Sequence, residues 1–145
     1  MFGFLSRLFG GNNNIVKDPD LGKVRYLESP NGSVWSGRLK SVSTNHVIQY
    51  FIESEEKVLK HQPKNRMLDN LSGEIDFRND IDQYFISERP LSRPANFQID
   101  IIHVPESIQG HDIQWICASP ESEFSVYFLD GKVVEVNIHE RDVTS

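Results

Sequence analysis

Hydrophobic and polar residues alternate with a period of two over much of the first third of the chain, and this spacing predicts β-strands. In the second of these strands, Trp35 and Leu39 fall on one face, while Arg38 and Lys40 fall on the other. The third strand is apolar on both faces, which is typical of a strand in the interior of a sheet. The three predicted strands are 22–27, 33–42 and 46–52.

The middle of the chain changes to the spacing of amphipathic helices. We expect a first helix to begin near Pro63, a residue suited to the first helical turn, and to stop at Gly73. A second helix is expected over 74–88 and ends before Pro90, because proline disfavours a helical residue in front of it. The apolar stripe of the second helix consists of Phe77, Ile81, Tyr84 and Phe85.

Alternation with a period of two returns after the helices and predicts four more strands. These strands are 97–104, 111–118, 124–128 and 134–138. The last two flank Asp130 and Gly131, and the positions of the apolar residues indicate the turn between them. A two-residue loop would place Glu135 among apolar residues, so we expect a three-residue loop that pairs Phe128 with Val134 and puts Gly131 at a bulge.

The order of three strands, two helices and four strands predicts the α+β class. Because hairpin-length connections join the strands within each block, we expect an antiparallel sheet of about seven strands with both helices packed on one face. A chain of 145 residues is long enough for one domain with its own core. We expect this domain to span 21–142, after an amphipathic segment at 1–11 and a linker at 12–20.

The net charge of -6 is concentrated in the C-terminal part of the chain. Residues 91–145 contain three basic and nine acidic side chains, whereas residues 21–52 contain four basic and one acidic. We do not expect a nucleic-acid ligand, because contacts with phosphates need Lys and Arg. A basic protein partner suits an acidic surface better, and an acidic surface that only maintains solubility is the alternative. The expected partner surface comprises Asp76, Asp80, Asp82, Glu121 and Glu123.

Residue types that often carry catalysis or bind metals are present, but their spacing is not that of a known motif. The five histidines show no pairing at helical spacing, and the single Cys117 alternates with apolar residues as a small core residue would. No phosphate-binding glycine loop or nucleophile elbow occurs. We therefore predict a non-enzymatic binding protein with no catalytic residues, cofactor or metal. The alternative is a hydrolase-type enzyme whose site is assembled across strands from His103, His111 and nearby carboxylates.

A single cysteine cannot form an internal disulfide, so we expect a cytoplasmic location. No segment reaches the roughly 18 consecutive apolar residues of a membrane-spanning helix. At helical spacing, however, the first residues form one apolar arc, and we expect them to dock on the protein's own sheet or on a partner. A disordered tail and membrane contact are the alternatives, the latter disfavoured because Arg7 is the only basic side chain in this segment. The docking residues are Phe2, Phe4, Leu5, Leu8 and Phe9.

Three short motifs resemble those of a family of small uncharacterised bacterial proteins. The motifs are Leu21-Gly22-Lys23-x-x-Tyr26, Ser33-Val34-Trp35-Ser36-Gly37 and Phe128-Leu129-Asp130-Gly131. Such proteins combine an opening strand, a Trp-x-Gly strand, a helical middle and a C-terminal sheet that ends in an Asp-Gly hairpin. The resemblance implies a bacterial cytoplasmic protein and, by analogy, an immunity or accessory protein that binds a basic toxin or effector. In structural terms, we expect Trp35 to be a core aromatic residue and Gly37 to mark either a bulge or a close approach of another group.

Overall fold

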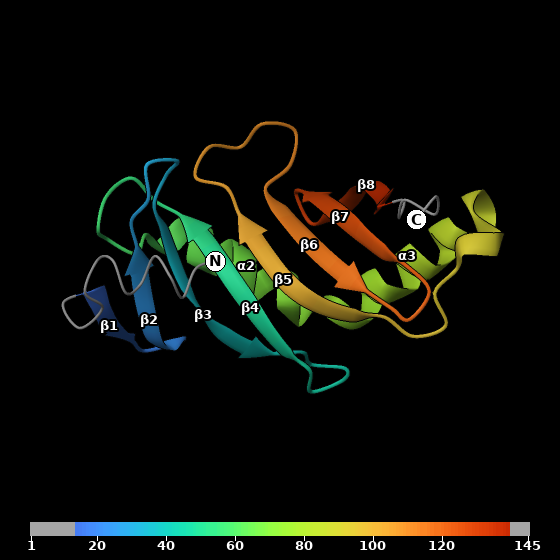
Figure 1. Ribbon diagram of the computed structural model, residues 1–145, viewed down its shortest axis with the longest axis horizontal. Coiled ribbons are helices and arrows are strands. Elements are labelled where there is room, and N and C mark those ends of the chain that lie inside the picture. Colours follow the sequence, from blue (N-terminus) through green and yellow to red (C-terminus); the bar gives the residue numbers. More distant parts are fainter. Residues whose placement is uncertain (1–13, 140–145) are drawn as a thin grey trace, which may run out of the picture.

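The computed structural model describes residues 14–139, which form one eight-stranded sheet and two α-helices (Figure 1). The strands are β1 (Ile15–Asp18), β2 (Gly22–Leu27), β3 (Val34–Lys40), β4 (Val47–Glu53), β5 (Gln98–Val104), β6 (Ile113–Ala118), β7 (Glu123–Leu129) and β8 (Lys132–His139). The helical elements are α2 (His61–Ser72), α3 (Glu74–Glu88) and the short 3-10 helix η2 (Pro90–Ser92). The amphipathic segment at 1–11 and its five docking residues lie outside the described residues, as does the end of the predicted domain at 140–142.

The strands lie side by side in the order in which they occur in the sequence, from β1 to β8. Neighbours are antiparallel except β4 and β5, which run parallel. Between these two strands the chain passes through α2 and α3, which lie behind the sheet in the view of Figure 1, and so returns to the edge at which β4 began. The α+β class is therefore confirmed, but the prediction of a wholly antiparallel sheet is wrong at this pair.

The strand β1 accounts for the difference between the seven strands predicted and the eight found, because it lies in the segment predicted to be a linker. A tight turn connects this strand to β2. In the turn, Asp18 Oδ2 accepts hydrogen bonds from the backbone N–H groups of Asp20 and Leu21, at 2.9 and 3.1 Å. Lys64 of α2 anchors the turn, since its Nζ lies 3.2 Å from Asp18 Oδ1 and 2.9 Å from Asp20 Oδ2. These polar contacts leave no hydrophobic signal in the sequence.

The hydrophobic core lies between the sheet and the two helices. Each helix contributes an apolar stripe, and α3 buries Ile81 and Phe85 as its spacing predicts. Trp35 is 1% exposed in this core, which confirms its predicted role. The largest buried side chains of the strands are Trp35, Trp115, Tyr50, Phe124 and Phe128. Cys117 is also buried, which confirms its predicted place in the core, and burial raises the pKa of its thiol.

Of the two alternatives predicted for Gly37, a bulge and a close approach, the structure shows the close approach. A Cβ atom at this position would lie 2.3 Å from Oη and 2.6 Å from Cζ of Tyr50, whose ring covers the glycine from the neighbouring strand β4. Real Cβ atoms are not found at such distances from other heavy atoms. The Trp-x-Gly pattern in β3 is thus explained by packing: Trp35 fills the core, and Gly37 leaves room for Tyr50.

The turn between β7 and β8 differs from the prediction, although most of the predicted register holds. Asp130 and Gly131 have φ angles of 51° and 75°, and positive values at both positions are those of a type I′ turn with a two-residue loop. Phe128 therefore pairs with Val133, and Val134 is left over as a β-bulge. The bulge shifts the register by one residue, and Glu135 returns to the face that carries Tyr127. The predicted three-residue loop is therefore wrong. The loop has two residues, and the bulge beyond it restores the predicted pairing of Val126 with Val136.

Neither of the described α-helices combines the length and the hydrophobicity needed to cross a membrane.

Candidate binding cleft

A cleft of about 800 Å³ lies beyond the carboxyl ends of β4 and β5. In sheets with parallel strands, ligands bind where neighbouring strands end at the same edge and their connections leave in different directions. Here the chain leaves β4 towards the helix layer and leaves β5 towards the adjacent strand β6. The loop that joins β2 to β3 forms a further wall. The volume is within the range of roughly 300–1,000 Å³ that is usual for ligand sites.

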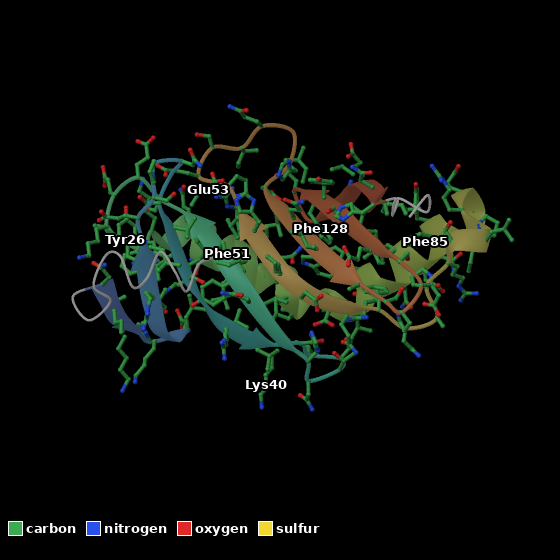
Figure 2. All side chains as sticks on the ribbon, viewed as in Figure 1. Tyr26, Lys40, Phe51, Glu53, Phe85 and Phe128 are labelled. Atoms are coloured by element: carbon green, nitrogen blue, oxygen red, sulfur yellow. The ribbon has the colours of Figure 1, made fainter. Side chains whose placement is uncertain are left out.

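Two carboxylates hold the walls of this β4/β5 cleft together. Glu53, the last residue of β4, accepts a hydrogen bond on Oε1 from the backbone N–H of Glu106, at 3.1 Å. Glu106 in turn accepts one on Oε2 from the backbone N–H of Glu55, at 2.7 Å. Figure 2 shows Glu53 at the end of the sheet opposite to Lys40. Because each loop supplies both a donor and an acceptor to the other, the two loops are fixed relative to each other.

The base of the cleft is held by buried backbone contacts. Ser54 is 3% exposed, and its N–H donates to the carbonyl oxygen of Ser33 at 3.0 Å. The Tyr26 hydroxyl lies 3.1 Å from the carbonyl oxygens of both Ser54 and Glu55. These contacts join the end of β4 to β2 and to the loop before β3. The cleft is therefore preorganised by the sheet.

His103 and Glu53 form the one side-chain pair of opposite potential charge inside the part of this cleft that the structure describes. His103 Nε2 lies 2.8 Å from Glu53 Oε2, and both side chains are partly exposed. This pairing follows from the parallel register, in which Phe51 is opposite His103. His111 also lines the cleft, and its ring packs edge-on against Tyr127 with 4.9 Å between ring centroids.

The two histidines that sequence analysis placed at one connection, His103 and His111, thus share the cleft. The others lie elsewhere: His46 pairs with Asp100 at the opposite end of the sheet, His61 begins α2, and His139, at the end of β8, forms a hydrogen bond with Ser125 of β7. Within residues 14–139, no three His, Cys, Asp or Glu side chains are arranged to hold a metal ion. The cleft offers an acid–base pair and carboxylates.

The acidic residues expected to form one partner surface are divided between two sides of the molecule. Asp76 and Asp80 are exposed on α3, in the helix layer. Asp82 forms an ion pair with Arg93, with Nε to Oδ1 at 2.7 Å and Nη2 to Oδ2 at 2.9 Å, which offsets its charge.

Glu121 is exposed in the turn before β7, and Glu123 begins that strand. Since Phe124 points into the core, alternation along β7 turns Glu123 to the face opposite the helices. The five acidic residues therefore do not gather into one surface. The acidic residues that do line one cleft, Glu53, Glu55 and Glu106, were missed, because their proximity depends on the parallel pair.

A second depression, of about 610 Å³, lies over β1 to β4 and has the opposite charge. Lys23, Arg25 and Arg38 line it, which agrees with the excess of basic residues in this part of the sequence. No pair of potential acid and base is held there among the described lining residues. The β4/β5 cleft is therefore the better candidate for a site.

No family model, no curated protein and no solved structure matches the chain. The fold and the site together define an α+β protein with a mostly antiparallel sheet and a polar, acidic cleft at its parallel strand pair.

Proposed function

We propose that this is a non-enzymatic binding protein that receives a basic segment of a protein partner in the β4/β5 cleft. The observation that carries the proposal is that three acidic residues, Glu53, Glu55 and Glu106, line one preformed cleft of about 800 Å³. Glu55 is exposed and forms no ion pair with another described residue, so its charge is available to a cation. The resemblance to small bacterial proteins supports a cytoplasmic accessory or immunity role, in which the partner is a basic toxin or effector.

Electrostatics favours a cationic group in this cleft. Lys60 lies 3.7 Å from Glu106, a long contact between partly exposed groups that stabilises the protein little. An arginine or lysine side chain of the partner can approach Glu55 and Glu106 together. Exposed ion pairs contribute about 0.2–1 kcal/mol each, so a short basic peptide is expected to bind weakly and with strong dependence on salt.

The proposal predicts that neutralising the cleft weakens the binding of a basic peptide. The probe is the peptide acetyl-GRGRG-amide, titrated into the ¹⁵N-labelled full-length protein. The Glu55→Gln/Glu106→Gln double variant should lose about tenfold in affinity, since two ion pairs of this size correspond to that factor. Glutamine keeps the carbonyl acceptor for the backbone N–H of Glu55, so the loops stay joined. The matched control, Asp76→Asn/Asp80→Asn, removes the same charge from α3 and should leave the affinity unchanged.

A second candidate function is acid–base catalysis, and the hydrogen bond between Glu53 and His103 favours it. A carboxylate that orients an imidazole is the arrangement in which histidine removes a proton from a nucleophile or water. The structure offers a control in His46, which pairs with Asp100 at 2.9 Å outside the cleft. Under this candidate, His103→Gln abolishes hydrolysis of 4-nitrophenyl acetate above the buffer rate, whereas His46→Gln does not. Equal rates for the two variants would exclude it.

A further inference from the structure

A smaller cavity of about 140 Å³ opens beside the β4/β5 cleft, where α2 begins. Glu53, Ser54 and Glu106 line both spaces, so the cavity and the cleft are neighbours. One water molecule occupies about 30 Å³ of liquid, so the cavity has room for a group of several heavy atoms. Its remaining polar lining comes from α2 and from the residue before it, and consists of two cations, Lys60 and Arg66, and the neutral Gln62.

Arg66 is the feature of the cavity that calls for a ligand. The side chain is partly exposed, but two of its three guanidinium nitrogens, Nε and Nη1, are buried and have no hydrogen-bond partner among the described residues. Buried N–H groups without partners are costly, and such groups in proteins nearly always have a partner or a bound molecule. The neighbouring carboxylates do not fill this role. Glu53 is engaged by His103 and by the backbone of Glu106, and neither acid forms an ion pair with Arg66.

The start of α2 adds a second reason for an anion in the cavity. The first N–H groups of a helix have no partner within the helix, and the helix dipole makes this end positive. Side chains usually satisfy these groups, but the residue at the cap position of α2 is Lys60, which makes no capping hydrogen bond. The first turn also lacks an acidic residue. Free N–H groups at the start of a helix are a common binding site for carboxylate and phosphate.

We propose that this cavity binds a carboxylate group, held by Arg66 and the start of α2, and that the segment received by the cleft carries this carboxylate next to its basic side chain. The second half of the proposal rests on the proposed function. A carboxylate suits the site better than a phosphate, because the acidic walls formed by Glu53 and Glu106 repel a dianion more strongly. The expected ligand is a short zwitterionic element, such as an arginine or lysine at the C-terminus of a chain.

Two small probes separate the two halves of the proposal. Nα-acetylarginine carries both the guanidinium and the carboxylate, whereas Nα-acetylargininamide lacks the carboxylate. In NMR titrations of the ¹⁵N-labelled full-length protein, the acid should bind about tenfold more tightly than the amide, the gain from one charge-assisted contact. Only the acid should shift the amide resonances of His61 and Gln62. In the Arg66→Met variant, the preference for the acid should fall to about one, while the amide still binds.

The controls keep the result decisive. Arg89→Met removes a charge from the exposed end of α3 and should preserve the preference for the acid. Arg66→Lys keeps the charge and should retain part of the preference, which covers the case in which Arg66→Met folds poorly. The inference is overturned if the wild-type protein binds the acid and the amide equally, or if the preference for the acid survives in Arg66→Met. Either result would mean that the cavity does not bind a carboxylate. If acetate shifts His61 and Gln62 while the amide does not bind, the carboxylate site stands and the proposed function fails.

Discussion

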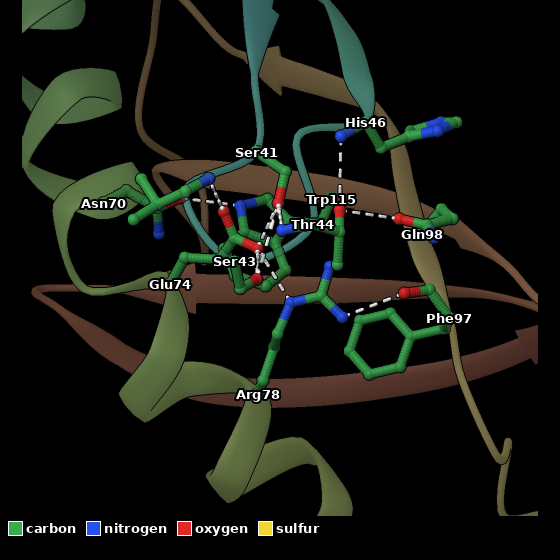
Figure 3. Close-up of polar contacts among 11 residues, drawn as sticks. Ser41, Ser43, Thr44, His46, Asn70, Glu74, Arg78, Phe97, Gln98 and Trp115 are labelled. Carbon is green, nitrogen blue, oxygen red and sulfur yellow. Dashed lines mark hydrogen bonds and ion pairs between the residues drawn. The ribbon is translucent and has the colours of Figure 1, made fainter.

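Replacing Glu74 by alanine is expected to lower the free energy of unfolding by about 3–5 kcal/mol, the cost of leaving a buried charge without its partner. Glu74 is fully buried at the start of α3, where its carboxylate joins the helix to the loop between β3 and β4 (Figure 3). Oε1 accepts the backbone N–H of Val42 at 2.8 Å, and Oε2 accepts the hydroxyl of Ser41 at 2.6 Å. The Ser43 hydroxyl donates to the same oxygen.

The partner that the Glu74→Ala variant leaves without its counter-charge is Arg78. Its Nε donates to Glu74 Oε2 at 2.8 Å, Nη1 donates to the carbonyl oxygen of Phe97 at 2.9 Å, and the guanidinium lies 4.3 Å from the centre of the Phe97 ring. Without Glu74, this mostly buried cation loses its counter-charge. Urea denaturation of Glu74→Ala measures the effect, with Glu88→Ala as the control, because Glu88 is exposed at the other end of α3. A loss below about 1 kcal/mol, the size of an exposed ion pair, would contradict this assignment.

The same carboxylate makes stability depend on pH. Burial by itself raises the pKa of Glu74, but hydrogen bonds from Ser41, Ser43, Arg78 and Val42 outweigh it, and the pKa is lowered. The contribution of ionised Glu74 is therefore complete above the pKa of the unfolded chain, about 4.3, and is lost as the pH falls through the lower pKa of the folded state. The stability difference between wild type and Glu74→Gln should stay constant down to about pH 5 and shrink below it. A constant difference down to pH 3 would contradict the lowered pKa.

The second large effect is expected at Gly37, where alanine should destabilise the protein by about 2–3 kcal/mol because it overpacks the core. The added methyl group would overlap the hydroxyl and ring of Tyr50, which is fully buried in the core. Thermal unfolding of Gly37→Ala measures the loss. Gly110→Ala is not a suitable control, since its φ of 83° adds backbone strain. Gly73→Ala is a better one, with the nearest atom of Phe77 at 3.0 Å.

A double variant tests whether the overlap with Tyr50 is the cause. Tyr50→Leu alone creates a cavity and should destabilise the protein, whereas in the Gly37→Ala background the shorter side chain makes room for the methyl group. The two losses should therefore be less than additive, by about 1 kcal/mol or more. Additive losses would show that Gly37 is needed for a reason other than the approach of Tyr50.

Most of the fold could be predicted because hydrophobic spacing reports which face of an element is buried. The stripe of α3 and the alternation in β2, β6 and β7 led directly to core residues such as Ile81, Trp115 and Phe124. The errors lie where polar contacts or backbone geometry decide the structure. β1 depends on the Asp18 turn and its contact with Lys64, and the bulge at Val134 depends on a type I′ turn that the alternation alone does not distinguish.

The site could be predicted only in part, because its residues meet through the parallel pairing of β4 and β5. His103 and His111 are separated by one connection, so the sequence suggested their proximity. Glu53 is 50 residues from His103 in the chain, and no local pattern brings the two together. Charge counts were misleading for the same reason: they indicated an acidic C-terminal half, whereas two of the three acidic residues of the cleft, Glu53 and Glu55, lie at the end of β4 and just after it.

The binding of acetyl-GRGRG-amide to the wild-type protein and to the Glu55→Gln/Glu106→Gln variant tests the central claim most directly. We predict that the peptide shifts the resonances of residues 53–56 and 105–107 in the wild type, that raising the salt concentration weakens binding, and that the variant binds about tenfold more weakly. Equal affinity for the two proteins, or shifts confined to α3 around Asp76 and Asp80, would contradict the account of the cleft as a receptor for a basic segment.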